Sequence, residues 1–279
     1  MRLLAGDWWN HHHIRHVAVR MRAKKSLGQN FLMHAQTAQR IVQAAGVGKG
    51  DTVLEIGPGT GMLTRTLLEA TNHVIAIEKD DELIPTLSDT FSQEIAGNRL
   101  TLIHGDALTF DTKSIAGPYR LVANIPYYIT GEIIRTYLTA PHKPESVTLL
   151  VQKEVAERIA RSKKESLLSL SVKAYGTPKY EFTVPRGAFK PAPSVDSAVL
   201  TVRDIRPDAF PSSEAESRFF AALRAGFAHK RKLLARNLEE IASKEHILSA
   251  FAAIPLSEKA RAEDLTLHEW RIIAQMLSS

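Results

Sequence analysis

Short apolar runs alternate with amphipathic stretches along the chain up to about residue 160. The apolar runs are rich in Val, Ile and Leu and are typical of buried strands, whereas the stretches between them repeat their apolar positions at helical spacing. We therefore predict strands over residues 52–56, 73–77, 100–104, 119–123 and 146–151. The helices predicted around them span residues 37–45, 61–70, 80–91, 131–139 and 153–162.

This alternation predicts the fold class, an α/β protein with a Rossmann-like parallel sheet that is covered by helices on both faces. Two further segments, residues 168–175 and 197–204, look strand-like and flank a proline-rich segment. Ligands of such sheets bind at the carboxyl ends of the strands. The residues that directly follow each strand are therefore the candidates for a functional site.

We expect three parts in the chain. Residues 1–20 show neither a helical nor a strand period, and we interpret them as a disordered tail or a mis-assigned start. Their three consecutive His side chains point in different directions, so we expect no metal site there. The α/β domain is predicted over residues 21–207 and a small helical domain over residues 208–279, whose first helix we expect to be capped by Ser212 or Ser213.

The composition excludes several classes of protein. The 279 residues are 44% hydrophobic, which supplies a core, but no apolar run is long enough for a membrane helix and no signal peptide is evident. We expect a soluble, cytoplasmic protein. The chain has no cysteine, which excludes disulfides, thiolate zinc sites and iron–sulfur clusters.

The positive charge is concentrated in one stretch, residues 218–238. The net charge of the chain is +6, and this stretch contains six cations and no carboxylate. We predict that it is a helix whose apolar positions pack inward and whose cations bind phosphates, a solvated surface helix being the alternative. The six cations are Arg218, Arg224, Lys230, Arg231, Lys232 and Arg236.

The segment Asn124-Ile125-Pro126-Tyr127 follows a predicted strand and has the composition of a clamp for a planar amino group. The lone pair of an adenine N6 amine is delocalised into the ring until acceptors on its N–H groups localise it. The Asn side-chain oxygen and an adjacent backbone carbonyl provide two acceptors, because proline fixes the chain direction and removes a competing donor. Tyr127 provides a ring on which a base can stack. Taken alone, the tetrapeptide is equally consistent with an ordinary turn.

A glycine turn and two carboxylates follow the other strands. Gly57, Gly59 and the glycine at position 61 form a G-x-G-x-G turn between a strand and a helix, where a ligand can approach the backbone closely. This spacing differs from the G-x-G-x-x-G of dinucleotide sites and resembles the adenosylmethionine site of Rossmann-like methyltransferases. Glu78 ends the next strand, where it can accept both ribose hydroxyls, and Asp106 is placed to accept from an adenine amino group.

Together these residues resemble the ribosomal RNA adenine dimethyltransferase family from about residue 24 to residue 270. The resemblance also rests on residues 24–32, 152–155, 189–198, 227–232 and 261–265. It implies that residues 24–32 close over S-adenosylmethionine and that the following residues contact this cofactor: Asn30, Leu32, Gly57, Glu78, Asp106 and Asn124.

Members of this family place two methyl groups on N6 of each of two adjacent adenines in small-subunit rRNA. The resemblance therefore implies a methyltransferase domain over residues 21–207, an rRNA-binding domain over residues 208–279, and the small ribosomal subunit with its 16S rRNA as partner. We expect a monomer that uses direct displacement without a general base. Phe189 precedes a stiff proline segment, and we expect its ring to stack on the adenine opposite Tyr127.

Three alternatives share parts of this pattern. A large-subunit rRNA adenine methyltransferase of the macrolide-resistance type also has an Asn-Ile-Pro-Tyr segment, although residues 152–155 and 195–198 favour the dimethyltransferase. A glutamine-amide methyltransferase of release factors would have a second proline in place of Ile125. A non-catalytic ribosome-assembly factor on the same fold would be expected to lack cofactor or clamp residues, and none is missing here.

Overall fold

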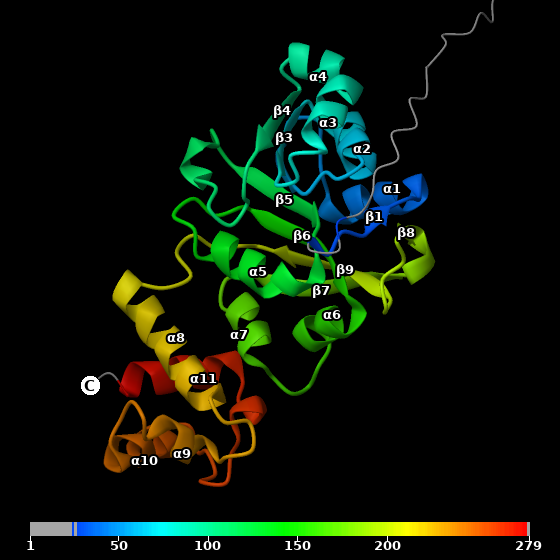
Figure 1. Cartoon of the computed structure of the whole chain (residues 1–279). Coiled ribbons are helices and arrows are strands. Elements are labelled where there is room, and N and C mark those ends of the chain that lie inside the picture. The colour runs from blue at the N-terminus through cyan, green and yellow to red at the C-terminus, as the bar shows by residue number, and fades with distance from the viewer. Residues whose placement is uncertain (1–23, 25–26, 278–279) are drawn as a thin grey trace, which may run out of the picture.

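The computed structural model describes residue 24 and residues 27–277, so the predicted tail over residues 1–20 lies outside the described residues. A central sheet carries helices on both faces, and the helices of the carboxyl-terminal region form a separate group beside it (Figure 1). No helix in the described part of the chain combines the length and apolarity that crossing a membrane requires.

The central sheet has seven strands in the order β4-β3-β2-β5-β6-β9-β7. The first five strands in this order are mutually parallel, and β9 and β7 are antiparallel to their neighbours. All five strands predicted in the first part of the chain are confirmed. The strand bounds are β2 (Thr52–Ile56), β3 (His73–Glu78), β4 (Leu100–His104), β5 (Tyr119–Asn124), β6 (Ser146–Gln152), β7 (Thr177–Val184) and β9 (Ser197–Arg203).

Helices cover both faces of this sheet because neighbouring strand residues face opposite sides. Leu54 and Ile56 of β2 belong to the core beneath α5, α6 and α7, whereas Val53 belongs to the core beneath α1, α2 and α3. The α/β fold class is thereby confirmed. The helix bounds are α1 (Ala35–Ala45), α2 (Met62–Ala70), α3 (Ile84–Thr90), α4 (Ser92–Ala96), α5 (Thr130–Leu138), α6 (Lys153–Ala160) and α7 (Leu167–Lys173).

A small two-stranded sheet joins segments that are distant in sequence. Strand β1 (Phe31–Leu32) pairs antiparallel with β8 (Phe189–Lys190), with Leu32 opposite Phe189. This pairing holds the amino-terminal segment beside the proline-rich segment. Short 3₁₀ helices occur both in the part with the sheet and among the carboxyl-terminal helices: η2 (Thr112–Ser114), η3 (Tyr127–Ile129), η4 (Arg186–Ala188) and η5 (Ala262–Asp264).

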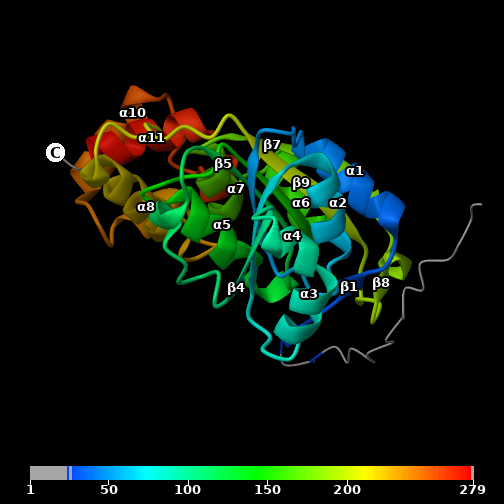
Figure 2. The same ribbon diagram turned by 90° about the horizontal axis from the view of Figure 1, so that it is seen from above.

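The carboxyl-terminal helices pack around Trp270, whose side chain is fully buried. Its ring stacks on Phe227 with a centroid separation of 5.6 Å and lies against Gly226, where a Cβ atom would come within 2.2 Å of the indole. Figures 1 and 2 show this group on the side of the sheet that is covered by α5 and α7. Its helices are α8 (Ser213–Phe227), α9 (Leu234–Leu238), α10 (Lys244–Ala253) and α11 (Leu267–Met276).

The strand predicted over residues 168–175 is wrong, because this segment forms helix α7. Ser166 caps the helix by accepting from the Ser169 N–H, and the Ser169 hydroxyl accepts from the Ser166 N–H in return. The missing strand is β7, which begins one residue before Pro178 at the edge of the sheet. An edge strand tolerates proline and polar residues, so its sequence lacked the apolar run of a buried strand.

The single helix predicted over residues 218–238 is also wrong. Helix α8 ends at Phe227, residues 228–233 form a loop, and α9 follows. The buried Asn237 amide stabilises this break, since it donates to the carbonyls of Gly226 at 2.6 Å and His229 at 3.2 Å. The predicted cap is confirmed, because the Ser212 hydroxyl accepts from the Ala215 N–H at the start of α8. A third difference is smaller: α3 begins four residues after its predicted start, with Pro85 in its first turn.

Candidate functional site

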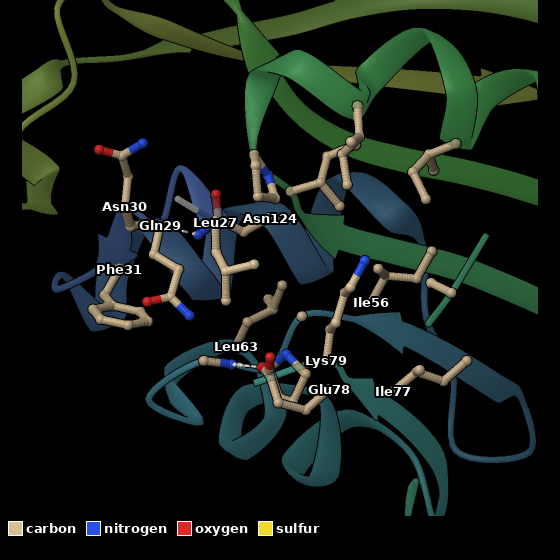
Figure 3. A pocket seen from close by; sticks show the side chains of 18 of the residues that line it. Leu27, Gln29, Asn30, Phe31, Ile56, Leu63, Ile77, Glu78, Lys79 and Asn124 are labelled. Atoms are coloured by element: carbon tan, nitrogen blue, oxygen red, sulfur yellow. Dashed lines mark hydrogen bonds between the residues drawn. The ribbon is translucent and has the colours of Figure 1, made fainter. Parts of the chain in front are cut away.

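The carboxyl ends of the parallel strands line a pocket, as the fold class predicts. Gly57 follows β2, Glu78 ends β3 and Asn124 ends β5, so these three residues meet at one edge of the sheet. Asp106, which follows β4, lines the same pocket. Figure 3 shows Glu78 and Asn124 on opposite walls with Leu63 between them, and Ile56 and Ile77 add apolar lining at one side.

The glycine turn forms the floor of the pocket in a conformation that favours glycine. Gly57, Gly59 and Gly61 have φ angles of 68°, 58° and 79°. A Cβ atom on Gly59 would come within 2.9 Å of the Phe31 ring, and one on Gly61 within 2.5 Å of the Phe91 ring. Glycine at these positions therefore lets both the ligand and the neighbouring rings approach the backbone.

Glu78 is buried, with 5% of its surface exposed, and is held by two backbone donors. Its Oε2 accepts from the Gly59 N–H at 3.1 Å and its Oε1 from the Asp80 N–H at 2.9 Å (Figure 3). Burial raises the pKa of this carboxyl, and the two backbone donors oppose that shift. Each oxygen keeps a lone pair for a further donor, which suits a pair of ribose hydroxyls.

Asp106 is a fixed acceptor on the neighbouring wall. Its Oδ2 accepts from the Lys79 ammonium at 2.8 Å and its Oδ1 from the Leu108 N–H at 2.9 Å. The hydrogen bond from Lys79 lowers the pKa of Asp106, so the group stays ionised near neutral pH. An ionised carboxylate beside a glycine-lined pocket can accept a hydrogen bond from an exocyclic amine.

The segment over residues 27–32 forms another wall of the pocket. Asp80, which follows β3, holds this segment through hydrogen bonds. The Gln29 amide donates to Asp80 Oδ2 at 2.8 Å, and the Lys24 ammonium donates to Oδ1 at 2.7 Å. Burial opposes ionisation of Asp80, but the bonds from Lys24 and Gln29 outweigh it and lower its pKa. Asn30 and Leu32 line the pocket as predicted.

The clamp segment follows β5 and is held by two side-chain contacts and one backbone contact. Asn124 Nδ2 donates to the Asn30 carbonyl at 3.1 Å, which assigns Oδ1 as the acceptor that lines the pocket. Pro126 has a φ of −57°, and its carbonyl accepts from the Ile129 N–H at 3.2 Å. The carbonyl of Ile125 is thus better placed than that of Pro126 to be the second acceptor. The Tyr127 hydroxyl shares a hydrogen bond of 2.5 Å with the Ser197 hydroxyl.

A second hollow adjoins the pocket on the far side of Asn30 and Tyr127. These two residues and Tyr128 line both spaces, and Gly28, Gln152, Pro193 and Ser194 complete the hollow. The proline-rich segment therefore reaches the hollow through Pro193 and Ser194. The two adjoining spaces give room for two ligands that meet beside the clamp.

The structure does not bring Phe189 opposite Tyr127. The Phe189 side chain is 4% exposed, belongs to the core around α1 and α2, and lines neither the pocket nor the hollow. Its position is set by the pairing of β8 with β1. The stacking role of Phe189 stays a prediction, and it requires the ring to leave this core.

The six predicted phosphate-binding cations are all exposed but lie on three elements rather than on one helix. Arg218 and Arg224 are on α8, and Arg236 is on α9, where it is paired with Glu239 at 3.2 Å. Lys230, Arg231 and Lys232 are on the loop between these helices. Three adjacent, exposed cations therefore lie on this one loop.

Four residues of the site were not identified from the sequence: Gln29, Lys79, Asp80 and Tyr128. Lys79 and Asp80 directly follow Glu78, so their position after a strand was a usable signal. The anchoring of Gln29 depends on a contact with Asp80 across 51 residues, which no local pattern contains.

Comparisons with known proteins identify the family of the chain. The chain matches the family model described as "Ribosomal RNA adenine dimethylase" over residues 20–279. A relative from Dehalococcoides mccartyi, named ribosomal RNA small subunit methyltransferase A, is 40% identical over 91% of this chain and 88% of its own length. A relative of the same name from Deinococcus radiodurans is 39% identical over 92% of this chain and 86% of its own length.

Two solved structures share the fold. A dimethyladenosine transferase from Plasmodium falciparum has a TM-score of 0.74 and 26% identity, and the match covers 87% of this chain and 95% of that one. The 23S rRNA methyltransferase ErmE has a TM-score of 0.72 and 25% identity, and the match covers 90% of this chain and all of that one.

The pocket fits S-adenosylmethionine, the cofactor of this family: the glycine turn admits a close ligand, Glu78 offers acceptors for ribose hydroxyls and Asp106 for an adenine amine. The family model covers almost the whole chain, including the clamp and the cations. The chain belongs to the ribosomal RNA adenine dimethylase family, whose members are S-adenosylmethionine-dependent enzymes that methylate adenine in rRNA.

Proposed function

We propose that the protein dimethylates N6 of two adjacent adenines in a loop near the 3′ end of small-subunit 16S rRNA, as part of small-subunit maturation. It acts as a monomer in the cytoplasm. The name of its relatives, which are about 40% identical, supports the small subunit as partner. The observation that carries the proposal is the assigned orientation of Asn124, whose Oδ1 is left as an acceptor in the pocket, next to Asn30, which lines both the pocket and the hollow.

The site residues form two groups, one that binds the cofactor and one that positions the adenine amine. Asn30, Leu32, Gly57, Gly59, Glu78 and Asp106 bind the cofactor, which supplies an electrophilic methyl group. The Asn124 side chain and the Ile125 carbonyl accept the two amine hydrogens of adenine and localise the lone pair on N6. Positioning by this clamp replaces a general base, because the amine becomes acidic only after it has gained the methyl group.

The rRNA is held by the second part of the chain. We propose that residues 21–207 bind the cofactor and carry out methyl transfer and that residues 208–279 bind rRNA through their exposed cations. Tyr127 is half-buried, and its ring is held by the bond to Ser197, so it can support a base with little further loss of freedom.

The test is methyl transfer by the purified chain. Labelled S-adenosylmethionine is supplied with immature small subunits or with large subunits, and the rRNA is digested and its modified nucleosides are identified by mass. We expect N6,N6-dimethyladenosine in small-subunit rRNA from the wild type and almost none from Asn124→Ala, with the binding of subunits retained. Equal turnover by Asn124→Ala would contradict the proposed clamp.

The alternative with structural support is methylation of large-subunit rRNA, since ErmE shares the fold over the whole of its length. The same experiment separates the two, because the label then appears in large subunits. A non-catalytic assembly factor would bind small subunits without transferring label to either.

A further inference from the structure

We propose that Tyr128 is a positioning residue that stacks on the nucleotide next to the acceptor adenine. The inference rests on the proposed function, since it deepens how that site receives RNA. It assigns a substrate contact to a residue outside the Asn124–Tyr127 clamp.

Tyr128 is 66% exposed, more than any other large apolar side chain recorded as exposed in the described part of the chain. It follows Tyr127 within η3 and lines the edge of both the cofactor pocket and the adjoining hollow. A ring in this place lies at the entrance through which an acceptor base reaches Asn124.

The exposed ring is held on its inner side. A Cβ atom on Gly28 would come within 3.0 Å of Tyr128 Cε1 and 3.2 Å of Cδ1, so the ring packs closely on the backbone of Gly28. Gly28 has a φ of 59°, a conformation that also favours glycine. The ring is therefore supported on one side and open on the other, and a base can stack on it with little loss of side-chain freedom.

Base flipping leaves the neighbouring base without a stacking partner, which an exposed aromatic ring can replace. When an acceptor base leaves its stack to reach a clamp, the neighbouring base loses a stacking partner. An aromatic side chain beside the entrance replaces that partner, and such a stack changes binding by about 5- to 150-fold. Tyr127 is held within the site by Ser197, whereas Tyr128 faces outward, so Tyr128 is the ring available to the neighbouring base.

The experiment measures kcat/KM for methylation of reassembled small subunits by the wild type, Tyr128→Phe, Tyr128→Leu and Tyr128→Ala. We expect Phe to retain the wild-type value and Leu and Ala to lower it by about tenfold or more, mainly through KM. Leu is the matched control, because it keeps apolar contact but removes the aromatic plane. The dissociation constant for S-adenosylmethionine is measured in all four proteins, because Tyr128 also lines the cofactor pocket. A rise in this constant that accounts for the whole loss of kcat/KM would overturn the inference.

A second arm replaces the nucleotide on either side of the acceptor adenosine with an abasic one. With the wild type, we expect the abasic substitution on one side to lower kcat/KM about as much as Tyr128→Ala does. With Tyr128→Ala, the same abasic substitution should lower kcat/KM little further. The inference would be overturned if the effects of Tyr128→Ala and of the abasic substitution added fully on both sides of the acceptor. Wild-type kinetics in Tyr128→Leu would also overturn it. If the wild type methylates no small subunit, the proposed function itself fails, so the two failures are distinguishable.

Discussion

The side-chain amide of Asn124 donates to the main-chain carbonyl of Asn30 across 3.1 Å. This bond joins the end of β5 to the segment that precedes β1, although the two residues are 94 positions apart in the chain. It uses the amide nitrogen and leaves the oxygen for an amine. The amino-terminal segment therefore sets the orientation of the clamp as well as closing one wall of the pocket.

Asn124→Asp tests this relationship, because Asp keeps an acceptor but cannot donate to the Asn30 carbonyl. In the variant, an ionised carboxylate would face the Asn30 carbonyl, which loses its donor. Leaving a polar group without its hydrogen-bond partner costs about 1–3 kcal/mol. We expect methyl transfer to fall by roughly 5- to 150-fold. Asn98→Asp, on an exposed turn, is the matched control. A rate within twofold of the wild type would show that the bond to Asn30 does not orient the clamp.

The sequence predicted the centre of the sheet well because the central strands are buried on both faces. The runs at 52–56 and 146–151 are mostly apolar, as is typical of central parallel strands. Strand β7 was missed because it lies at the edge, where it has the exposed Lys179, which pairs with Glu181, in place of an apolar run. The break after α8 was missed because Asn237 stabilises it from ten residues further along the chain.

The site was predictable to the extent that topology determines it. Glu78 and Asn124 each end a parallel strand, so the alternation of elements alone places them at one edge. The position of Phe189 was not predictable, because the pairing of β8 with β1 directs it into the core rather than toward Tyr127. Spacing in the sequence contains no information about that pairing.

Glu78→Gln should weaken the binding of S-adenosylmethionine. The carboxylate accepts from two backbone N–H groups and has further lone pairs for a ribose, whereas the amide has a single acceptor oxygen. Hydrogen bonds to a charged group contribute about 1.5–3 kcal/mol each, so we expect the dissociation constant to rise about 10- to 100-fold. Isothermal titration calorimetry measures it, and thermal unfolding of the variant without cofactor reports any separate loss of stability. An unchanged dissociation constant would exclude Glu78 as the ribose acceptor.

Glu55→Gln should make the protein more stable at neutral pH. Glu55 is 1% exposed, and neither of its carboxyl oxygens has a hydrogen-bond partner in the described part of the chain. Burial raises its pKa to about 8; Thr64 lowers it in part and Glu78 raises it further. The unfolded chain therefore releases this proton at a lower pH than the folded chain does.

The sign of the pH dependence follows from that difference. Between the ordinary pKa of 4.5 and about 8, the folded state binds one more proton than the unfolded state, so stability falls as the pH rises. The loss is at most about 1.4 kcal/mol per pH unit. Urea unfolding at several pH values measures the free energy of unfolding of both proteins. The advantage of Glu55→Gln over the wild type should increase from pH 5 to pH 8. A difference that does not vary with pH would mean that Glu55 is ionised in the folded protein.

Charge reversal on the loop over residues 228–233 should weaken the binding of small-subunit rRNA. Lys230, Arg231 and Lys232 are adjacent and exposed, and Asn237 holds the loop through the carbonyls of Gly226 and His229. Each phosphate contact that these cations make contributes roughly 0.7–0.9 to the slope of log affinity against log salt. We expect Lys230→Glu with Arg231→Glu to lower affinity and to reduce this slope by about 1.5.

The matched control changes the net charge equally at a distant place. Lys49→Glu with Lys113→Glu alters two exposed lysines of the α/β part of the chain. If the loop binds phosphates, this control keeps most of the salt dependence, because only the loop charges release counterions on binding. If both double variants lose the same affinity and slope, the effect comes from net charge alone. Binding measured at several salt concentrations therefore decides between a built phosphate site and a solvated basic surface.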